Sequence, residues 1–220
     1  MTFTLADVRS EIEATEPDNR IQKETNPEGK RIGPLQLLET ALAGVLELRP
    51  EVYRDARGSF QETYNAAKYI QFGITCPFVQ DNHSHSQKNI LRGLHYQLVH
   101  AQAKLCRVVE GEVLDVAVDV RLGSPQFGKW TSVLLSARAQ NQIYIPAGFA
   151  HGFLTLTDSA QFLYKCSDFY DPTDEHGILW NDPDLQIPWK VNAPVVSEKD
   201  ARLPILSQIP REFLPEYFPG

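Results

Sequence analysis

The stretch CRVVEGEVLDVAVDVR, residues 106–121, decides the fold of this chain. Two sets of residues alternate along it: Leu114, Val116, Val118 and Val120 form the apolar set, and Asp115, Ala117, Asp119 and Arg121 form the other. A period of two residues is typical of a β-strand, and the pair Glu110-Gly111 before it is typical of a turn. The stretch therefore predicts a strand that is entered from a hairpin.

Similar short runs recur on both sides of this strand, over residues 93–97, 130–136, 142–145, 152–155 and 161–166. Glycine and proline separate them, as in Gly123-Ser124-Pro125 and Pro146-Ala147-Gly148. Many short strands without alternating helical patterns predict an antiparallel all-β sandwich or closed barrel. Near the C-terminus, residues 198–202 predict a short helix that Pro204 ends.

Residues 1–32 differ from the rest of the chain. They are polar and charged, with a weak helical pattern followed by the turn-rich run NPEGK at residues 26–30. We interpret them as an N-terminal extension that either holds one short helix or is partly disordered. Residues 33–220 then form a single domain.

Composition narrows the classes of function. The 220 residues carry 28 acidic and 21 basic side chains, a net charge of −7 that opposes broad binding to nucleic acid or anionic lipid. No apolar run approaches the roughly 18–20 residues of a membrane span, and the N-terminus lacks the apolar segment of a signal peptide. Three cysteines without paired spacing indicate reduced thiols in a cytoplasmic protein. Residues 54–130 nevertheless hold nine basic against seven acidic residues, which is compatible with a cationic pocket.

Titratable and polar residues are densest over residues 78–105. His83, His85 and His100 lie there in loop-like polar surroundings, where we expect solvated side chains. His95 lies inside an expected strand, and His151 lies in an apolar segment rich in special backbone residues. From these surroundings alone, each of the last two is either a satisfied core histidine or an active one.

The pair His83-x-His85 has the spacing of two metal ligands on one side of a strand. A metal-binding barrel would place a carboxylate four or five residues later, but Asn89 and Ile90 stand there. The sequence also lacks a Gly-x-Ser-x-Gly motif, a cysteine beside a histidine and a glycine-rich phosphate loop. The chemistry that remains is proton transfer, with histidine as base, tyrosine as acid and a cation beside an oxyanion or phosphate.

The order and spacing of several blocks identify a family. The blocks are RGSF (57–60) with Glu62, VQDN (79–82), LRGLHYQ (91–97), QAKL (102–105), DVAVDVR (115–121), SP (124–125), FG (127–128), IPAGFAHGF (145–153), YK (164–165), Tyr170 with Pro172, and WNDP (180–183). Over roughly residues 43–206 the chain closely resembles the dTDP-4-dehydrorhamnose 3,5-epimerases of deoxysugar biosynthesis. The N-terminal extension falls outside the resemblance.

The resemblance implies an antiparallel jelly-roll (cupin-like) barrel with short peripheral helices, which is usually a homodimer. It implies an isomerase that needs no metal or organic cofactor. The implied reaction is epimerisation at C3 and C5 of a nucleotide-linked, dTDP-type 4-keto-6-deoxyhexose, by proton abstraction beside the C4 ketone and reprotonation on the opposite face.

The resemblance also implies roles for individual residues. His95 matches the general base, Asp200 the carboxylate that orients it, Tyr164 the acid, and Lys104 the cation beside the developing enolate oxygen. Substrate binding is implied for a larger set: Arg57, Glu62, Gln80, Asp81, Asn82, Arg92, His151, Glu175 and Lys199. Tyr170 is expected to stack on the base or the sugar.

Three alternatives stay open at this point. The first is a relative that epimerises one carbon only, or a ketoisomerase on a similar barrel, although the presence of Tyr164 favours an epimerase. The second is a non-catalytic sugar-nucleotide binding module, which would have no reason to keep a base with its acid. The third is a metal-dependent cupin, which metal analysis of the purified protein would distinguish.

Overall fold

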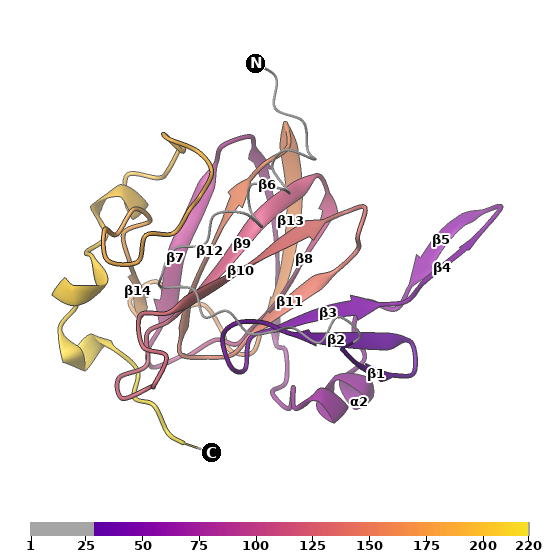
Figure 1. Cartoon of the computed structure of the whole chain (residues 1–220), viewed down its shortest axis with the longest axis horizontal. Coiled ribbons are helices and arrows are strands. Elements are labelled where there is room, and N and C mark those ends of the chain that lie inside the picture. The colour runs from indigo at the N-terminus through magenta and orange to yellow at the C-terminus, as the bar shows by residue number, and fades with distance from the viewer. Residues whose placement is uncertain (1–28, 220) are drawn as a thin grey trace.

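The structure, a computed structural model, describes residues 29–219 of the chain. Its body consists of two β-sheets that enclose a common interior (Figure 1). Seven strands form the larger sheet in the order β1-β2-β3-β11-β8-β13-β6, and five form the smaller in the order β10-β9-β12-β7-β14. Every pairing between these strands is antiparallel. The predicted all-β jelly roll is confirmed.

The bounds of the elements are as follows. The larger sheet comprises β1 (Lys30–Ile32), β2 (Leu35–Glu39), β3 (Leu46–Pro50), β11 (Gln142–Ile145), β8 (Lys104–Glu110), β13 (Ser159–Cys166) and β6 (Gln80–Gln87). The smaller comprises β10 (Trp130–Ser136), β9 (Glu112–Asp119), β12 (Phe149–Thr155), β7 (Leu91–Gln97) and β14 (Glu175–Gly177). Short helical elements are α2 (Ala66–Tyr69) and the 3-10 turns η1 (Ile70–Phe72), η2 (Asp200–Arg202), η3 (Leu206–Gln208) and η4 (Arg211–Phe213).

Strand β9 is the predicted strand, and the structure buries both of its faces. Val113 and Ala117 pack between the two sheets, in a cluster that also contains Phe153 and Phe162. The opposite face, which carries Leu114, Val116 and Val118, packs beneath residues from the C-terminal part of the chain. Asp115 and Asp119 are therefore fully buried acids, because a strand in the middle of a three-layer arrangement has no solvent face.

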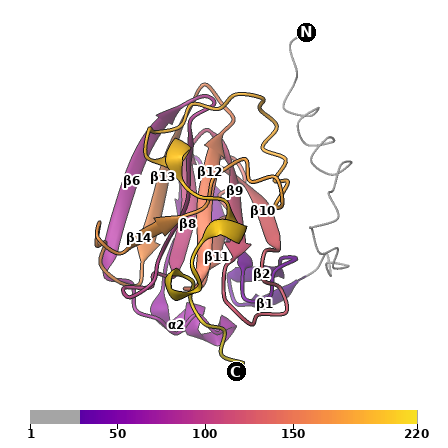
Figure 2. The same cartoon turned by 90° about the vertical axis from the view of Figure 1, so that its left-hand side faces the viewer.

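The outer faces of the two sheets are covered by different segments. Leu206, Ile209 and Leu214 from the C-terminal segment pack over the smaller sheet, where Figure 2 shows this segment in front of the strands. Tyr69 and Ile74, in and after the short helical region, pack over the larger sheet. The outer faces of both sheets are thus covered, and the space between their inner faces contains the cavity described below.

A third, two-stranded sheet projects from the body. Strands β4 (Val52–Asp55) and β5 (Gly58–Gln61) form a hairpin arm that extends away from the barrel (Figure 1). Its cross-strand pair Tyr53 and Phe60 is 50% and 69% exposed. The arm therefore presents two aromatic side chains to solvent, outside the main sheets.

The structure differs from several of the sequence-based predictions. Residues 1–28 of the predicted extension lie outside the described residues, and its last residues, Lys30–Ile32, form β1 of the larger sheet. The expectation of loop-like surroundings for His83 and His85 is wrong, because both lie in β6 with their side chains exposed. The short helix predicted over residues 198–202 is the 3-10 turn η2. Within residues 29–219, no helix has the length and apolar character that crossing a membrane requires.

Candidate active site

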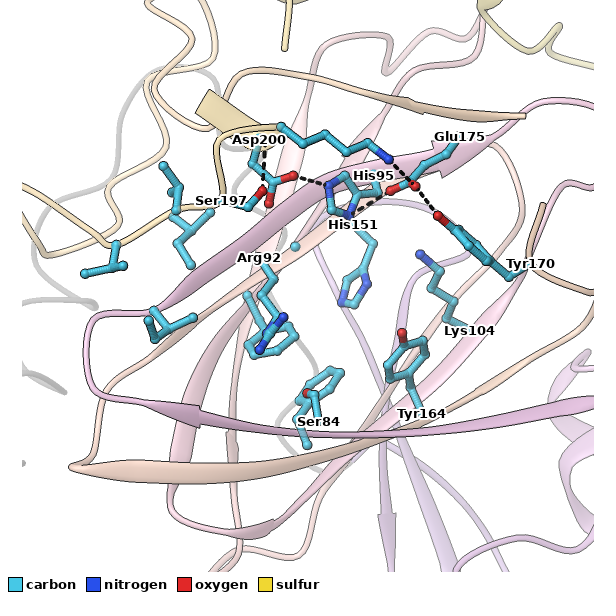
Figure 3. A pocket seen from close by; sticks show the side chains of 18 residues that line it. Ser84, Arg92, His95, Lys104, His151, Tyr164, Tyr170, Glu175, Ser197 and Asp200 are labelled. Carbon is cyan, nitrogen blue, oxygen red and sulfur yellow. Dashed lines mark hydrogen bonds and ion pairs between the residues drawn. The ribbon is translucent and has the colours of Figure 1, made fainter. Parts of the chain in front are cut away.

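A cavity of about 590 Å³ opens between the sheets, as Figure 3 shows from close by. Strands β6, β8 and β13 of the larger sheet supply one wall, and β7, β12 and β14 of the smaller sheet supply the other. Residues between positions 195 and 200 complete the lining. The cavity brings together nine of the predicted site residues: Arg92, His95, Lys104, His151, Tyr164, Tyr170, Glu175, Lys199 and Asp200.

The backbone brings two histidines to adjacent positions on one wall. His95 on β7 is the register partner of His151 on β12, and the register shifts just beyond this pair. Gly93 and Gly152 make the close approach of the two strands possible, because a Cβ added to Gly93 would lie 2.5 Å from the Gly152 Cα. Glycine is thus required beside the histidines for steric reasons.

A carboxylate fixes the ring of His95. The Nε2 atom of His95 lies 2.8 Å from Oδ1 of Asp200, whose other oxygen accepts a hydrogen bond from the Gly93 N–H at 3.3 Å. The Asp200 N–H donates to Ser197 Oγ at 3.0 Å, and the Asp200 side chain is only 6% exposed. With Nε2 committed to this anchored carboxylate, Nδ1 is the nitrogen left to accept a proton.

The Asp200 carboxylate stays ionised in this setting. Burial by itself raises the pKa of Asp200. The hydrogen bond and charge of His95, together with the Gly93 N–H, outweigh burial and hold the pKa below its ordinary value. An ionised partner suits a histidine that gains and loses a proton, because it stabilises the imidazolium form.

On the Nδ1 side of His95 lies a second group of polar side chains. Glu175 Oε1 is 3.6 Å from Nδ1, and Glu175 Oε2 accepts hydrogen bonds from Tyr170 and Lys199. Burial opposes the charge of Glu175, but these two donors hold its pKa below the ordinary value. The hydrogen bond to Glu175 in turn raises the pKa of Tyr170 to about 12.

His151 has its own carboxylate, which the sequence analysis did not assign. Its Nε2 lies 3.1 and 3.0 Å from the two oxygens of Asp115, and both side chains are buried. Burial lowers the pKa of His151 and raises that of Asp115, and the attraction within the pair opposes both changes without reversing them. The signal available in the sequence was an acid inside the apolar strand that decides the fold.

The opposite wall carries the predicted acid and the predicted cation. Tyr164 on β13 projects into the cavity across from His95, and Lys104 at the start of β8 lies between them (Figure 3). Burial raises the pKa of Tyr164 to about 12, so its phenol stays protonated at neutral pH. Within residues 29–219, the Tyr164 hydroxyl makes no hydrogen bond and Lys104 makes no ion pair. Both groups are therefore available to a ligand.

The polar strand β6 contributes from its inner face. Gln80 and Asn82 line a smaller pocket of about 220 Å³ that shares His95, Tyr170 and Glu175 with the main cavity. Ser84 lines the main cavity, and its hydroxyl is buried without a partner in the described part of the chain. Sequence reasoning missed Ser84, although it alternates with the two exposed histidines of the same strand.

Three predicted residues do not face the cavity. Asp81 lies on the exposed side of β6 and pairs with Lys165. Arg57 lies at the turn of the hairpin arm with its side chain 90% exposed and bound to Asp55. Glu62 follows the arm and bonds Lys68 and Asn65. The arm points away from the strands that carry the cavity in the same chain (Figure 1).

The residues that could hold a metal are not His83 and His85, the pair whose spacing the sequence analysis weighed and found unsupported. His83 and His85 are exposed and join no group of three ligands among residues 29–219. One such group does exist in the described part of the chain, formed by Cys106, Asp115 and His151. It lies at and beneath the wall of the cavity, since His151 lines the cavity and the other two residues are fully buried.

Comparisons with known proteins identify chains that are similar to this one over most of its length. The family model described as dTDP-4-dehydrorhamnose 3,5-epimerase matches residues 39–208. An enzyme of that description from Shigella flexneri is 50% identical over 168 residues, which are 76% of this chain and 93% of the relative.

Solved structures of similar chains are also known. A dTDP-6-deoxy-D-glucose-3,5-epimerase from Legionella pneumophila, in complex with dTDP-4-keto-L-rhamnose, has a TM-score of 0.82 and 46% identity, covering 84% of this chain and 100% of that one. A 3'-monoepimerase from Streptomyces bikiniensis, in complex with dTDP-quinovose, has a TM-score of 0.75 and 37% identity, covering 79% and 90%.

Proposed function

The chain belongs to the dTDP-4-dehydrorhamnose 3,5-epimerase family, and from that premise we propose that it inverts C3 and C5 of a dTDP-linked 4-keto-6-deoxyhexose with its own side chains as base and acid. One observation carries the proposal: His95, held by Asp200 on one wall of the cavity, lies across from Tyr164, with Lys104 between them. A base, an acid and a cation around one cavity are the groups that this reaction requires.

The first step is removal of a proton next to the ketone. The C4 carbonyl acidifies the protons on C3 and C5, because loss of either proton gives an enolate. His95 takes the proton through Nδ1, since its Nε2 donates to Asp200. The ionised Asp200 then stabilises the imidazolium, which lowers the barrier to the transfer.

Lys104 acts on the oxygen of the enolate. Negative charge develops on the C4 oxygen in the transition state, and an ammonium placed beside it stabilises that state more than the neutral ketone. Lys104 meets this requirement because it lines the cavity without an ion pair among the described residues. The cation therefore contributes chiefly to kcat.

Tyr164 returns a proton on the other face of the sugar. Its phenol projects from β13, in the sheet opposite the one that carries His95, and burial keeps it protonated. Inversion at a carbon follows when the proton leaves toward one wall and arrives from the other. His95, Lys104 and Tyr164 supply the proton transfers and the charge for one inversion; His95 then loses its proton to solvent and Tyr164 regains one from solvent before the second carbon reacts.

In this proposal, polar side chains of the main cavity and of the adjoining pocket bind the nucleotide part of the substrate. Arg92 offers a planar guanidinium to the diphosphate, and its Nε already donates to Ser86 Oγ at 3.1 Å. Gln80 and Asn82 add amide donors in the adjoining pocket. The exposed ring of Tyr170 is free to stack on the thymine base.

Arg57 takes part through a homodimer. Its position on the projecting arm places it outside the cavity of its own chain, and the open pair Tyr53 and Phe60 gives the arm an apolar surface for a second copy. A two-fold dimer that exchanges arms would bring each Arg57 to the partner's cavity. The partners proposed are thus a nucleotide sugar and a second copy of the chain.

Mixed dimers test the exchange of arms. Arg57→Ala and His95→Ala would each be inactive alone, but a heterodimer would hold one site with both residues intact. An equal mixture should recover about one quarter of the wild-type activity, since half of the dimers are mixed and half of their sites are complete. Recovery of no activity would place Arg57 outside the site of the partner.

The proposed location is the cytoplasm. The three cysteines, Cys76, Cys106 and Cys166, are free thiols in the structure. Free thiols are typical of proteins in a reducing compartment.

Deuterium exchange tests the proposed function. We expect NMR of the 4-keto sugar nucleotide with enzyme in heavy water to show exchange and inversion at both C3 and C5. His95→Gln should abolish both exchanges while the protein remains folded by circular dichroism. Full exchange in that variant would remove His95 from the role of base.

The one-carbon alternative has one observation in its favour. The monoepimerase from Streptomyces bikiniensis shares the fold at a TM-score of 0.75. Exchange and inversion confined to C3 in the same NMR experiment would assign this chain to that activity.

A further inference from the structure

We propose that Cys106, Asp115 and His151 form a binding site for a thiophilic divalent cation such as Zn²⁺, and that a cation bound there inhibits the enzyme. The site lies at the wall of the cavity, behind the imidazole of His151. The binding half of this inference stands on the three side chains alone. The inhibition half rests on the proposed function.

The three ligand atoms are already close to one another. The Cys106 Sγ, one Asp115 oxygen and one His151 ring nitrogen all lie within 4.8 Å of each other. Tetrahedral zinc, with bonds of about 2.0–2.3 Å, requires its ligand atoms to be about 3.3–3.6 Å apart. The imidazole and carboxylate are 3.0–3.1 Å apart, so they separate by a few tenths of an ångström, and the thiol moves by at most roughly 1.5 Å.

The donor set matches the chemistry of zinc. A thiolate, an imidazole and a carboxylate are the three side-chain ligands that zinc takes most often, and the thiolate selects against Mg²⁺ and Ca²⁺. A divalent cation with one thiolate and one carboxylate is electrically neutral, which suits a site with no exposed surface on Cys106 or Asp115. The thiol proton passes to solvent on binding, as metal binding to cysteine requires.

The surroundings allow entry and also limit affinity. His151 lines the open cavity, so a cation enters through the substrate pocket and water is available as a fourth ligand. Lys104, which lines the same cavity, carries a positive charge that repels a cation and weakens binding. Cys106 belongs to an otherwise apolar buried cluster that includes Val108 and Val113, and Tyr164 is its register partner on β13.

A cation bound at this site would inhibit the enzyme because it changes the contacts of His151 and the charge near Lys104. It takes the ring nitrogen through which His151 now bonds Asp115, and it places a second positive charge near Lys104. Both changes alter the wall against which the ketone and its enolate would lie. A bound nucleotide sugar and the cation should therefore compete.

Cobalt tests the binding half without any assay of activity. Chelator-treated wild-type protein titrated with Co²⁺ should develop a thiolate-to-cobalt charge-transfer band that saturates near one equivalent. The Cys76→Val variant is the matched control, because Cys76 lies in a different cluster with its Sγ 3.8 Å from the Tyr144 hydroxyl. It should keep the band, and Cys106→Val should lose it.

The outcomes separate clearly. Absence of the band in wild-type protein with excess Co²⁺, or its persistence in Cys106→Val, overturns the site. Valine suits the apolar surroundings of Cys106, and Cys106→Ser serves as a second variant if Cys106→Val has a lowered melting temperature. The spectroscopic result holds whether or not the protein is an epimerase, so the two proposals fail independently.

Zinc tests the inhibition half. Wild-type and Cys76→Val enzymes should lose activity with added Zn²⁺ and recover it with chelator. Cys106→Val should keep its activity without metal and need at least about tenfold more Zn²⁺ for half inhibition. Equal inhibition of both variants would show that zinc acts elsewhere, and would overturn the regulatory part of the inference.

Discussion

Replacing Asp200 by asparagine tests whether Asp200 fixes the tautomer in which His95 acts as a base. The two oxygens of Asp200 accept from two donors, His95 Nε2–H and the Gly93 N–H. An asparagine at this position has one oxygen and one NH₂ group, so it satisfies only one of these donors. If the oxygen accepts from Gly93, the NH₂ group faces His95 Nε2 and requires the tautomer with its proton on Nδ1. That tautomer has no lone pair on the nitrogen that faces the cavity.

The magnitude follows from what is lost. A positioned general base contributes about 10²–10⁴ to the rate, and a carboxylate-to-amide change that imposes the wrong tautomer costs about 10⁴ in other enzymes. We expect kcat for Asp200→Asn to fall by about 10³–10⁴, a rise in barrier of about 4–5 kcal/mol. KM should change much less, because the substitution removes an interaction that matters only once the proton moves.

The assay is deuterium exchange at C3 and C5 followed by NMR, with KM measured in parallel. Glu198→Gln is the matched control, because it makes the same chemical change two residues away on a side chain that is 91% exposed. The control should behave as wild type. An Asp200→Asn enzyme with kcat within tenfold of wild type would refute the assignment of His95 as a base oriented by Asp200.

Three further predictions follow from the structure. Tyr164→Phe should retain much of the exchange but lose inversion, because the base remains and the acid of the opposite wall is gone; equal retention of both by NMR would remove its role. Folding lowers the pKa of Asp200, so its stabilising effect is present above its ordinary pKa of 3.8 and is lost as pH falls through the lowered value. The unfolding free energy of Asp200→Asn should therefore depend less on pH below about pH 4 than that of wild type, and identical pH slopes in urea titrations would contradict this. Trp130→Phe should cost about 2–4 kcal/mol in the same titrations, since Trp130 is buried and its Nε1 donates to the Leu185 carbonyl at 2.8 Å; a loss below about 0.5 kcal/mol would contradict that account.

The sequence predicted most strands of the barrel core, and it missed several others, among them the short strands β1 to β5 and the longer, polar strand β6. Strands β10 and β11 have the predicted bounds, because hydrophobic alternation marks them. Strand β6 reads as a loop because both of its faces are polar. Its exposed side holds His83 and His85, and its inner side holds Asn82 and Ser84, which face a cavity rather than a core. A strand that lines a polar cavity lacks the alternation of apolar and polar residues from which strands are predicted.

The resemblance led us to expect the pairing of His95 with Asp200, but nothing in the sequence analysis assigned the pairing of His151 with Asp115. Asp115 and His151 lie 36 positions apart, and only the antiparallel register of β9 with β12 brings them together. The position of Arg57 depends on an arm that leaves the barrel. Local sequence patterns do not show whether the arm reaches the cavity of its own chain or that of a second copy.

The site contains two carboxylate–histidine pairs, and burial decides what each can do. Asp200 and His95 meet at the edge of the cavity, where backbone and serine contacts keep the carboxylate charged. His151 lines the cavity with little exposed surface and Asp115 lies fully buried behind it, where burial pushes the pKa of the acid up and that of the base down. The first pair therefore favours a histidine that cycles through the imidazolium, and the second favours a histidine that stays neutral. Because the pKa values of the two aspartates shift in opposite directions, exchanging the proton chemistry of the two pairs would require a change in burial rather than in residue type.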